Sequence, residues 1–419
     1  MSVRAPSSAP NVFDAGLPTF TYSFNATPHD ILDDLRTAQS RAPIAIGPLG
    51  PEILSYELAR NMLRDNRFSM PPGITLAAQG ITSGPLYDKI TSSLLGLEGA
   101  PHTRLRKLVS KAFTPRATAR LQDTIHDVVN GLIDRVMDAG QCDIVTDIAR
   151  PYPTPIICAL LGAPRADWQL FSEWTDEIFK AFNFQPDATF DEAAIMRAWG
   201  ELDAYVDDMV AARRENLTDD LLSELIRAET DGDRLNLDEL RMLVAGFLMA
   251  GTDTTRNQLA ASVYVLCEHP EQWAKLGEHP ELAMQAVEET MRHSPTGCIV
   301  PRTAVVDAEF GGYTFPAGTF VFVNTYAANR DPAIYADADR FDITRRDTPG
   351  LLTFGGGAHY CLGANLARRE LAEALAVLTR RLAAPRRIGP APWKSVLGMT
   401  GPTTLRIAFD SERLVTADA

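Results

Sequence analysis

Long hydrophobic runs, paired cysteines and excess positive charge are all missing from this 419-residue chain. Residues 1–10 are not apolar enough for a secretory signal or a membrane anchor, so we expect a soluble, cytoplasmic protein. The five cysteines are odd in number and contain no Cys-x-x-Cys pair, which excludes a disulfide framework and indicates a reducing compartment. A formal net charge of −14 argues against non-specific binding to nucleic acid.

The chain also lacks any low-complexity or linker-like stretch that would divide it. Its length alone would suggest two or three domains, but a hydrophobic content of 45% is enough for one large core. We predict a flexible N-terminal segment over residues 1–25 and one large domain over residues 26–419.

What the sequence does contain is a glycine-rich loop, residues 354–363, that carries one cysteine and leads into a run of strong helix formers. Three consecutive glycines let the backbone pass where a Cβ atom would collide, which suggests that something large and flat lies against the loop. Cys361 then stands at a helix N-terminus, where the macrodipole and free N–H groups favour a thiolate. A thiolate beside a planar cofactor can ligate haem iron. The alternative is a buried structural cysteine, since free cysteine is among the most buried residue types.

The loop resembles the haem-binding signature of the cytochrome P450 superfamily, Phe-Gly-x-Gly-x-His-x-Cys-x-Gly, at Phe354, Gly355, Gly357, His359, Cys361 and Gly363. The resemblance implies haem b as the cofactor and Cys361 as the axial ligand of its iron. It also implies that Phe354 shields the sulfur, that His359 reaches a haem propionate and that Gly355 belongs to the cofactor-binding loop. The implied fold is mainly α with a small β-rich region, in a single large domain.

A basic segment, residues 102–116, holds five lysines and arginines and no acidic residue. On a helix His102 and Arg106 lie four residues apart on one face, so both can reach the same anion. Alone, the segment would be interpreted as a solvated basic helix; by resemblance it is the helix whose His and Arg bind a haem propionate. Arg302, in a predicted strand, resembles the second propionate arginine. Upstream, residues 98–101 replace the family's common Asp-Pro-Pro, which changes the local conformation of the loop.

The longest predicted helix begins at Asn236, which can form a capping box with Glu239, and runs to about Glu268 before a His-Pro pair. Its apolar middle contains several polar residues. Threonine hydroxyls that bond to the preceding turn would bend the helix there. The alternative is a polar surface stripe, which the strongly apolar flanks argue against.

Residues 250–254 within this helix resemble the superfamily's oxygen-binding motif, Ala/Gly-Gly-x-Asp/Glu-Thr. The resemblance implies that Ala250 and Gly251 leave room for dioxygen and that Asp253 and Thr254 deliver protons.

Glu289 and Arg292 form a Glu-x-x-Arg pair, which on a surface helix would contribute little. Its distance upstream of the cysteine fits the superfamily's buried Glu-Arg-Arg network, which holds the cysteine loop in place. Arg340 or Arg345 would be the third member, and the sequence leaves that choice open.

The resemblance implies a soluble bacterial-type monooxygenase that inserts one atom of dioxygen into a hydrophobic small molecule. Two electrons would come from a ferredoxin or flavodoxin with an NAD(P)H-dependent reductase, and we expect a monomer. Six apolar residues are expected to line the substrate pocket: Phe182, Leu243, Phe247, Ile299, Val300 and Met399. The basic segment, together with Arg368 and Arg369, is expected to steer an acidic redox partner.

Two other functions are compatible with this sequence. A peroxygenase of the same fold would use peroxide directly, but such enzymes tend to lack the acid–alcohol pair that this chain keeps. A non-catalytic haem gas sensor or carrier would not need a proton relay.

Smaller elements are also predicted. Residues 70–101 form a loop that shapes a pocket mouth, and residues 313–323 and 395–409 form β-hairpins. An aromatic-rich helix pair over residues 168–213, with a polar break at residues 185–188, resembles the lid over the substrate cavity.

Overall fold

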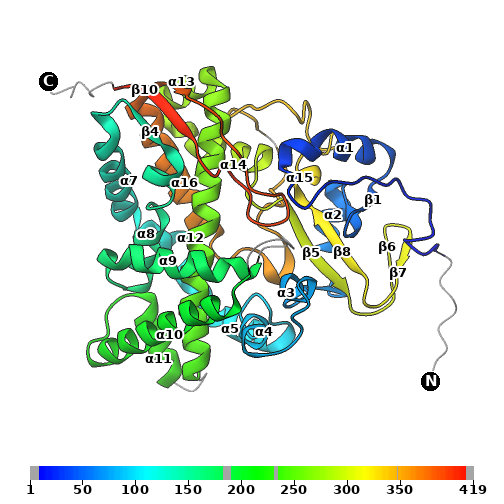
Figure 1. The fold of residues 1–419 in the computed structure, drawn as a ribbon, viewed down its shortest axis with the longest axis horizontal. Coiled ribbons are helices and arrows are strands. Elements are labelled where there is room, and N and C mark those ends of the chain that lie inside the picture. The colour runs from blue at the N-terminus through cyan, green and yellow to red at the C-terminus, as the bar shows by residue number, and fades with distance from the viewer. Residues whose placement is uncertain (1–8, 183–189, 231–234, 347, 412–419) are drawn as a thin grey trace.

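The computed structural model describes residues 9–182, 190–230, 235–346 and 348–411. The long helix α12 runs through the molecule between a helical side and a side where most strands gather (Figure 1). The predicted architecture, mainly α with a small β-rich region, is therefore confirmed. No helix of the described ranges is long and apolar enough to cross a lipid bilayer.

On the helical side, α12 (Leu237–Glu268) packs against α8, α9, α10, α14 and α16. Its members are α5 (Gly99–Val109), α6 (Pro115–Ala119), α7 (Gln122–Met137), α8 (Pro153–Leu161), α9 (Trp168–Phe179), α10 (Glu192–Glu215), α11 (Leu221–Thr230), α13 (Pro270–Glu278), α14 (Ala283–His293) and α16 (Ala364–Arg381). Beside the strands lie α1 (Pro28–Arg41), α2 (Tyr56–Met62) and α15 (Thr325–Ala328).

The largest sheet has five strands in the order β1 (Ile44–Gly47), β2 (Gly50–Ile53), β8 (Phe320–Asn324), β5 (Ile299–Ala304) and β3 (Phe68–Ser69). Only the β2–β8 pair is parallel. A second sheet orders β4 (Gln141–Asp143), β10 (Arg406–Ser411) and β9 (Leu382–Arg387), and β6 (Ala308–Phe310) pairs with β7 (Tyr313–Phe315).

Both predicted hairpins are wrong in their pairing. β7 pairs with β6 because Gly311 and Gly312, with φ of 58° and 88°, make the tight two-residue turn that a hairpin favours, whereas β8 joins the five-stranded sheet. In the tail, β10 pairs with β9 and β4. A shorter hairpin, closed by a bridge between Trp393 and Pro402, carries Met399 to Gly297.

Two segments are more ordered than the sequence predicts. Residues 70–101 contain two short helices, α3 (Ile74–Ala78) and α4 (Pro85–Thr91), rather than only loop. In the N-terminal segment, Val12 is fully buried and its N–H donates to Thr314 O at 3.0 Å, so residues 9–25 are anchored to the strands. The predicted boundary between a flexible segment and the large domain stays a prediction, and residues 1–8 lie outside the described residues.

Helix α12 begins as predicted. The Asn236 side chain accepts from the Glu239 N–H, and the Glu239 carboxylate accepts from the Asn236 N–H, which completes the capping box. The hydroxyls of Thr252 and Thr254 each donate to the carbonyl four residues earlier, at 2.7 Å. The predicted bonding of threonine to the preceding turn is therefore confirmed.

Candidate active site

The cysteine loop is closed by its own backbone, since Cys361 N–H donates to Phe354 O at 2.9 Å. Gly357 has a φ of +65°, and a Cβ on it would lie 2.5 Å from Leu63 O at the end of α2. A Cβ on Gly356 would lie 3.0 Å from Leu63 Cβ. These two glycines therefore serve close packing against α2, which corrects the expectation that the whole glycine run faces a flat cofactor. Gly355 is also at positive φ, but a Cβ on it would have only His359 O within 4 Å, at 3.8 Å.

Cys361 stands three residues before the start of α16. It is exposed to solvent, yet the surrounding protein raises the pKa of its thiol by desolvation. The Gly363 N–H and the Arg106 and Arg368 guanidiniums act in the opposite direction but do not outweigh burial. The N–H group at the helix start thus lowers the pKa of the Cys361 thiol, as expected, but burial outweighs this effect. A metal ion would supply the missing stabilisation of the anionic sulfur.

Histidine and arginine side chains gather beside the cysteine loop. His102 on α5 stacks on His359 with ring centroids 4.3 Å apart, and Arg106 on the same helix donates to Tyr360 O in the cysteine loop. Burial lowers the pKa of His102, Arg106 and His359. The predicted convergence of His102 and Arg106 on one place is thus observed.

Arg302 on β5 joins this group and is only 2% exposed. Burial lowers its pKa to about 10, and within the described residues no ion pair is formed by its guanidinium. Glu98 is the carboxylate nearest to the cluster, with its Oε1 3.1 Å from His359 Nε2, although that nitrogen has no hydrogen bond of good geometry. A buried guanidinium and an unsatisfied imidazole nitrogen fit an anionic ligand group. The residues present therefore fit the propionates of a haem.

Glu98 was not predicted as a site residue. It accepts the Met70 N–H at 2.7 Å and stands immediately before α5. The departure from the family's common sequence at residues 98–101 was the signal that could have identified it.

One face of helix α12, which we call its open face, is not buried in the core and carries Met242, Gly246, Ala250 and Thr254. Ala250 is exposed, and Met242, Gly246 and Thr254 are half-buried, at successive intervals of four residues. Gly251 points elsewhere, because a Cβ there would lie 2.9 Å from Ile157 Cδ1 on α8. Close helix packing is therefore the structural reason for Gly251, whereas Ala250 lies on the open face of α12.

The predicted pocket residues are not all on that face. Leu243 is 1% exposed and Phe247 8% exposed, and the Phe247 ring packs 5.2 Å from Phe113. Both follow the open positions by one residue, which on a helix turns them by about 100° into the core. Met242 and Gly246 therefore share the open face with Ala250, whereas Leu243 and Phe247 lie beside it, and the substrate pocket stays a prediction.

The other pocket residues come from separate elements. Ile299 and Val300 are half-buried on β5, close to where Met399 meets Gly297. Phe182 packs against Phe179, with ring centroids 5.7 Å apart. The polar break at residues 185–188 lies outside the described residues.

The Glu-Arg-Arg network is resolved by the structure. Arg292 binds both oxygens of Glu289, at 2.7 and 2.9 Å, and Arg345 Nε lies 3.2 Å from Glu289 Oε2. Arg340 instead extends to Asp342 at 3.3 Å, and its side chain is 66% exposed. Arg345 is therefore the third member.

Glu370 on α16 is a buried carboxyl group that sequence analysis did not identify. Burial raises its pKa to about 8, against the effect of a hydrogen bond with Thr255 on α12. It therefore bridges α16 and α12 as a neutral acid at neutral pH.

This carboxyl predicts how stability depends on pH. Because the folded pKa is raised, the stabilisation is complete below about pH 4.5 and is lost as pH rises through 8. The free energy of unfolding of Glu370→Gln should equal that of the wild type at pH 5. At pH 9 it should exceed the wild-type value by about 2–4 kcal/mol, because each unit of pKa shift corresponds to roughly 1.4 kcal/mol. Identical pH dependence of the two proteins would contradict this prediction.

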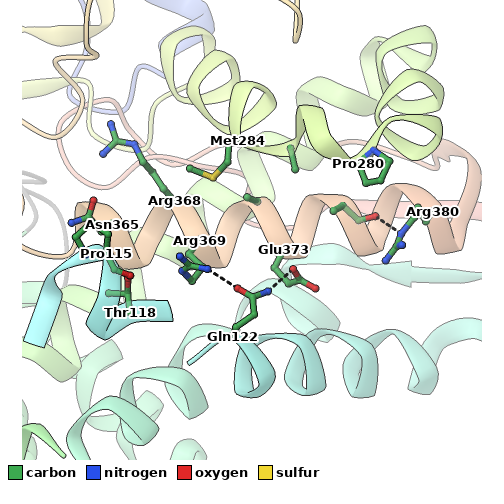
Figure 2. Close-up of a pocket in the computed structure, with 13 residues that line it drawn as sticks. Pro115, Thr118, Gln122, Pro280, Met284, Asn365, Arg368, Arg369, Glu373 and Arg380 are labelled. Carbon is green, nitrogen blue, oxygen red and sulfur yellow. Dashed lines mark hydrogen bonds between the residues drawn. The ribbon is translucent and has the colours of Figure 1, made fainter. Parts of the chain in front are cut away.

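A groove of about 570 Å³ runs along α16, the helix that follows the cysteine (Figure 2). Arg369 donates to Gln122 at 2.9 Å, and Gln122 donates to Glu373 at 2.8 Å. Arg368 lies 4.4 Å over the Phe354 ring and pairs with Glu288 at 2.5 Å. The groove is thus linked to the cysteine loop by Arg368.

Comparison with known proteins agrees with this geometry. A family model described as Cytochrome P450 matches residues 79–383. Luteothin monooxygenase of Streptomyces thioluteus is 39% identical over 381 residues, covering 90% of this chain and 92% of the relative. Mycinamicin IV hydroxylase/epoxidase of Micromonospora griseorubida is 38% identical over 372 residues, covering 86% and 91%.

A solved structure of epothilone B-bound cytochrome P450epoK matches with a TM-score of 0.85 at 27% identity, covering 93% of this chain and 100% of that one. The predicted family and fold therefore agree with these relatives over most of the chain. The chain belongs to the cytochrome P450 family and is a haem-dependent monooxygenase.

Proposed function

We propose that this enzyme hydroxylates, or otherwise oxidises, a hydrophobic small molecule, with haem b as its cofactor. The observation that carries the proposal is the cluster of two arginines and two histidines beside the exposed Cys361: Arg106, Arg302, His102 and His359. The small, open face of α12 around Ala250 supports an apolar substrate. We also propose a monomer located in the cytoplasm.

When bound, the haem would supply the iron centre that activates dioxygen. Cys361 would hold the iron through its sulfur, and the arginines and histidines of this cluster would hold the propionates. Thr254 and Asp253 would hold and move protons beside the open face of α12. The Glu289 network would keep the cysteine loop in position.

The test is a screen of apolar compounds for the spectral shift that substrate binding causes, followed by turnover with surrogate redox partners. Product formation that requires dioxygen, NAD(P)H and the partners supports a monooxygenase. Efficient turnover with peroxide alone would favour the peroxygenase. Haem binding without product from any compound would favour a sensor or carrier.

We propose a ferredoxin or flavodoxin as electron donor, docking near the groove beside α16. Lys107, Lys111 and Arg116 are exposed there, and the adjoining Pro115 and Thr118 line the groove. Arg104 and Arg368 are instead paired with Glu239 and Glu288, so the basic surface is smaller than the sequence predicts.

Lys111→Glu should slow reduction by an acidic ferredoxin several-fold at low salt and have little effect at high salt. The reason is that steering between exposed charges is screened beyond about 8 Å at physiological ionic strength. Stopped-flow reduction would measure it. Arg197→Glu is the matched control, since Arg197 is exposed on α10, which packs with α9, α11 and α12. Equal effects of the two variants at low salt would refute docking at this surface.

A further inference from the structure

A series of charged side chains runs from the buried Asp253 on α12 to the half-buried Asp176 on α9. Asp253 is 5% exposed and accepts from Arg256 Nε at 2.7 Å. Arg256 Nη1 lies 2.5 Å from Asp176 Oδ1 on α9. Asp176 in turn accepts from Arg150 at 2.7 Å. Asp253 and Asp176 therefore share one guanidinium.

A further cation, Lys394, approaches from the hairpin between Trp393 and Pro402. It donates to Asn257 Oδ1 at 2.9 Å on α12. Burial lowers the pKa of Lys394, an effect that Asp253 partly offsets. The charged groups that face Asp253 are thus Arg256 on its own helix, Asp176 on α9 and Lys394 from the hairpin, with Arg150 behind Asp176.

The guanidinium holds only one side of the Asp253 carboxylate. Both bonds from Arg256, through Nε and Nη2, end on Oδ1. Burial alone would lower the pKa of Arg256, yet Asp253 and Asp176 together raise it. Both carboxylates therefore interact strongly with the same cation, and removing one leaves the other with a larger share of it.

We infer that Asp176 on α9 is a positioning residue for proton delivery, because it shares Arg256 with Asp253 and so weakens the hold of the guanidinium on that acid. A carboxylate with a guanidinium to itself favours the charged form and takes up a proton less readily. Proton uptake by Asp253, followed by transfer to the Thr254 hydroxyl, would then be fastest when α9 packs against α12. This inference rests on the proposed function of Asp253 and Thr254.

The test compares Asp176→Asn and Arg256→Gln in the intact enzyme. The first readout needs no turnover: infrared titration of the Asp253 carboxyl band, assigned by its loss in Asp253→Asn. The pH midpoint should move down in Asp176→Asn and up in Arg256→Gln. A merely structural role gives no reason for opposite shifts. Asp203→Asn, which breaks the Lys89–Asp203 pair between α4 and α10, should leave the midpoint unchanged.

Turnover provides the second readout. In Asp176→Asn the product formed per NAD(P)H should fall at least threefold and the solvent isotope effect should rise. Asp176→Glu, which keeps the charge, should restore both. If Asp176→Asn does not fold, Arg150→Gln serves instead. Without Arg150, Asp176 should interact more strongly with Arg256 and leave less of the guanidinium for Asp253, so the pH midpoint of the Asp253 carboxyl band should rise.

Midpoint shifts of the same sign in Asp176→Asn and Arg256→Gln, or no shifts, would overturn the inference. That outcome is distinct from failure of the proposed function. If Thr254→Ala lost no product per electron, the relay itself would be wrong, whatever the titrations of Asp253 show.

Discussion

Cys361→His will lose turnover and will lack the strongly red-shifted Soret band that the wild type shows as a reduced carbon monoxide complex. That band reports a thiolate ligand to haem iron, and an imidazole does not reproduce its electron donation. The site also disfavours an anionic sulfur without a metal, since desolvation raises the pKa of the Cys361 thiol. Difference spectra of the reduced protein with and without carbon monoxide provide the measurement.

Cys267→Ser is a suitable control for this experiment. Cys267 is half-buried in the last turn of α12, far along the chain from the loop, and its substitution should leave the band in place. A globin-like band in the wild-type protein would show that the central assignment is wrong.

Thr254→Ala should bind substrate and consume NAD(P)H normally while its product per NAD(P)H falls by about tenfold or more, the electrons appearing as peroxide. The reason is the proposed proton relay, in which the hydroxyl of Thr254, on the open face of α12 and next to Asp253 in sequence, passes protons. Parallel measurements of product, peroxide and NAD(P)H consumption give the partition of electrons.

The chain supplies a matched control two residues away. Thr252 also donates to the carbonyl four residues earlier at 2.7 Å, but it is fully buried. Thr252→Ala removes the same kind of backbone hydrogen bond without touching the open face, so its electrons should still yield product. Equal uncoupling in the two variants would mean that helix distortion, rather than proton delivery, is responsible.

The parts of this site that lie close together in sequence were predictable. Fixed spacing in the sequence identified the cysteine loop. It also predicted that His102 and Arg106 share one face of a helix and that Glu289 pairs with Arg292. The capping box at the start of α12 was also predictable from the sequence, because a cap involves residues only three positions apart. Local geometry decides such contacts, so residue type and spacing suffice to predict them.

Only the tertiary structure decided the rest. It selected Arg345 over Arg340, turned Met242 and Gly246 rather than Leu243 and Phe247 to the open face, and brought Asp176 to Arg256. Each depends on how an element is rotated against neighbours from distant parts of the chain. A shift of one position along a helix changes the direction of the side chain by about 100°, which is enough to move an apolar residue from the open face into the core. Periodicity in the sequence shows that a helix buries one face, but packing against the other helices determines where that face ends.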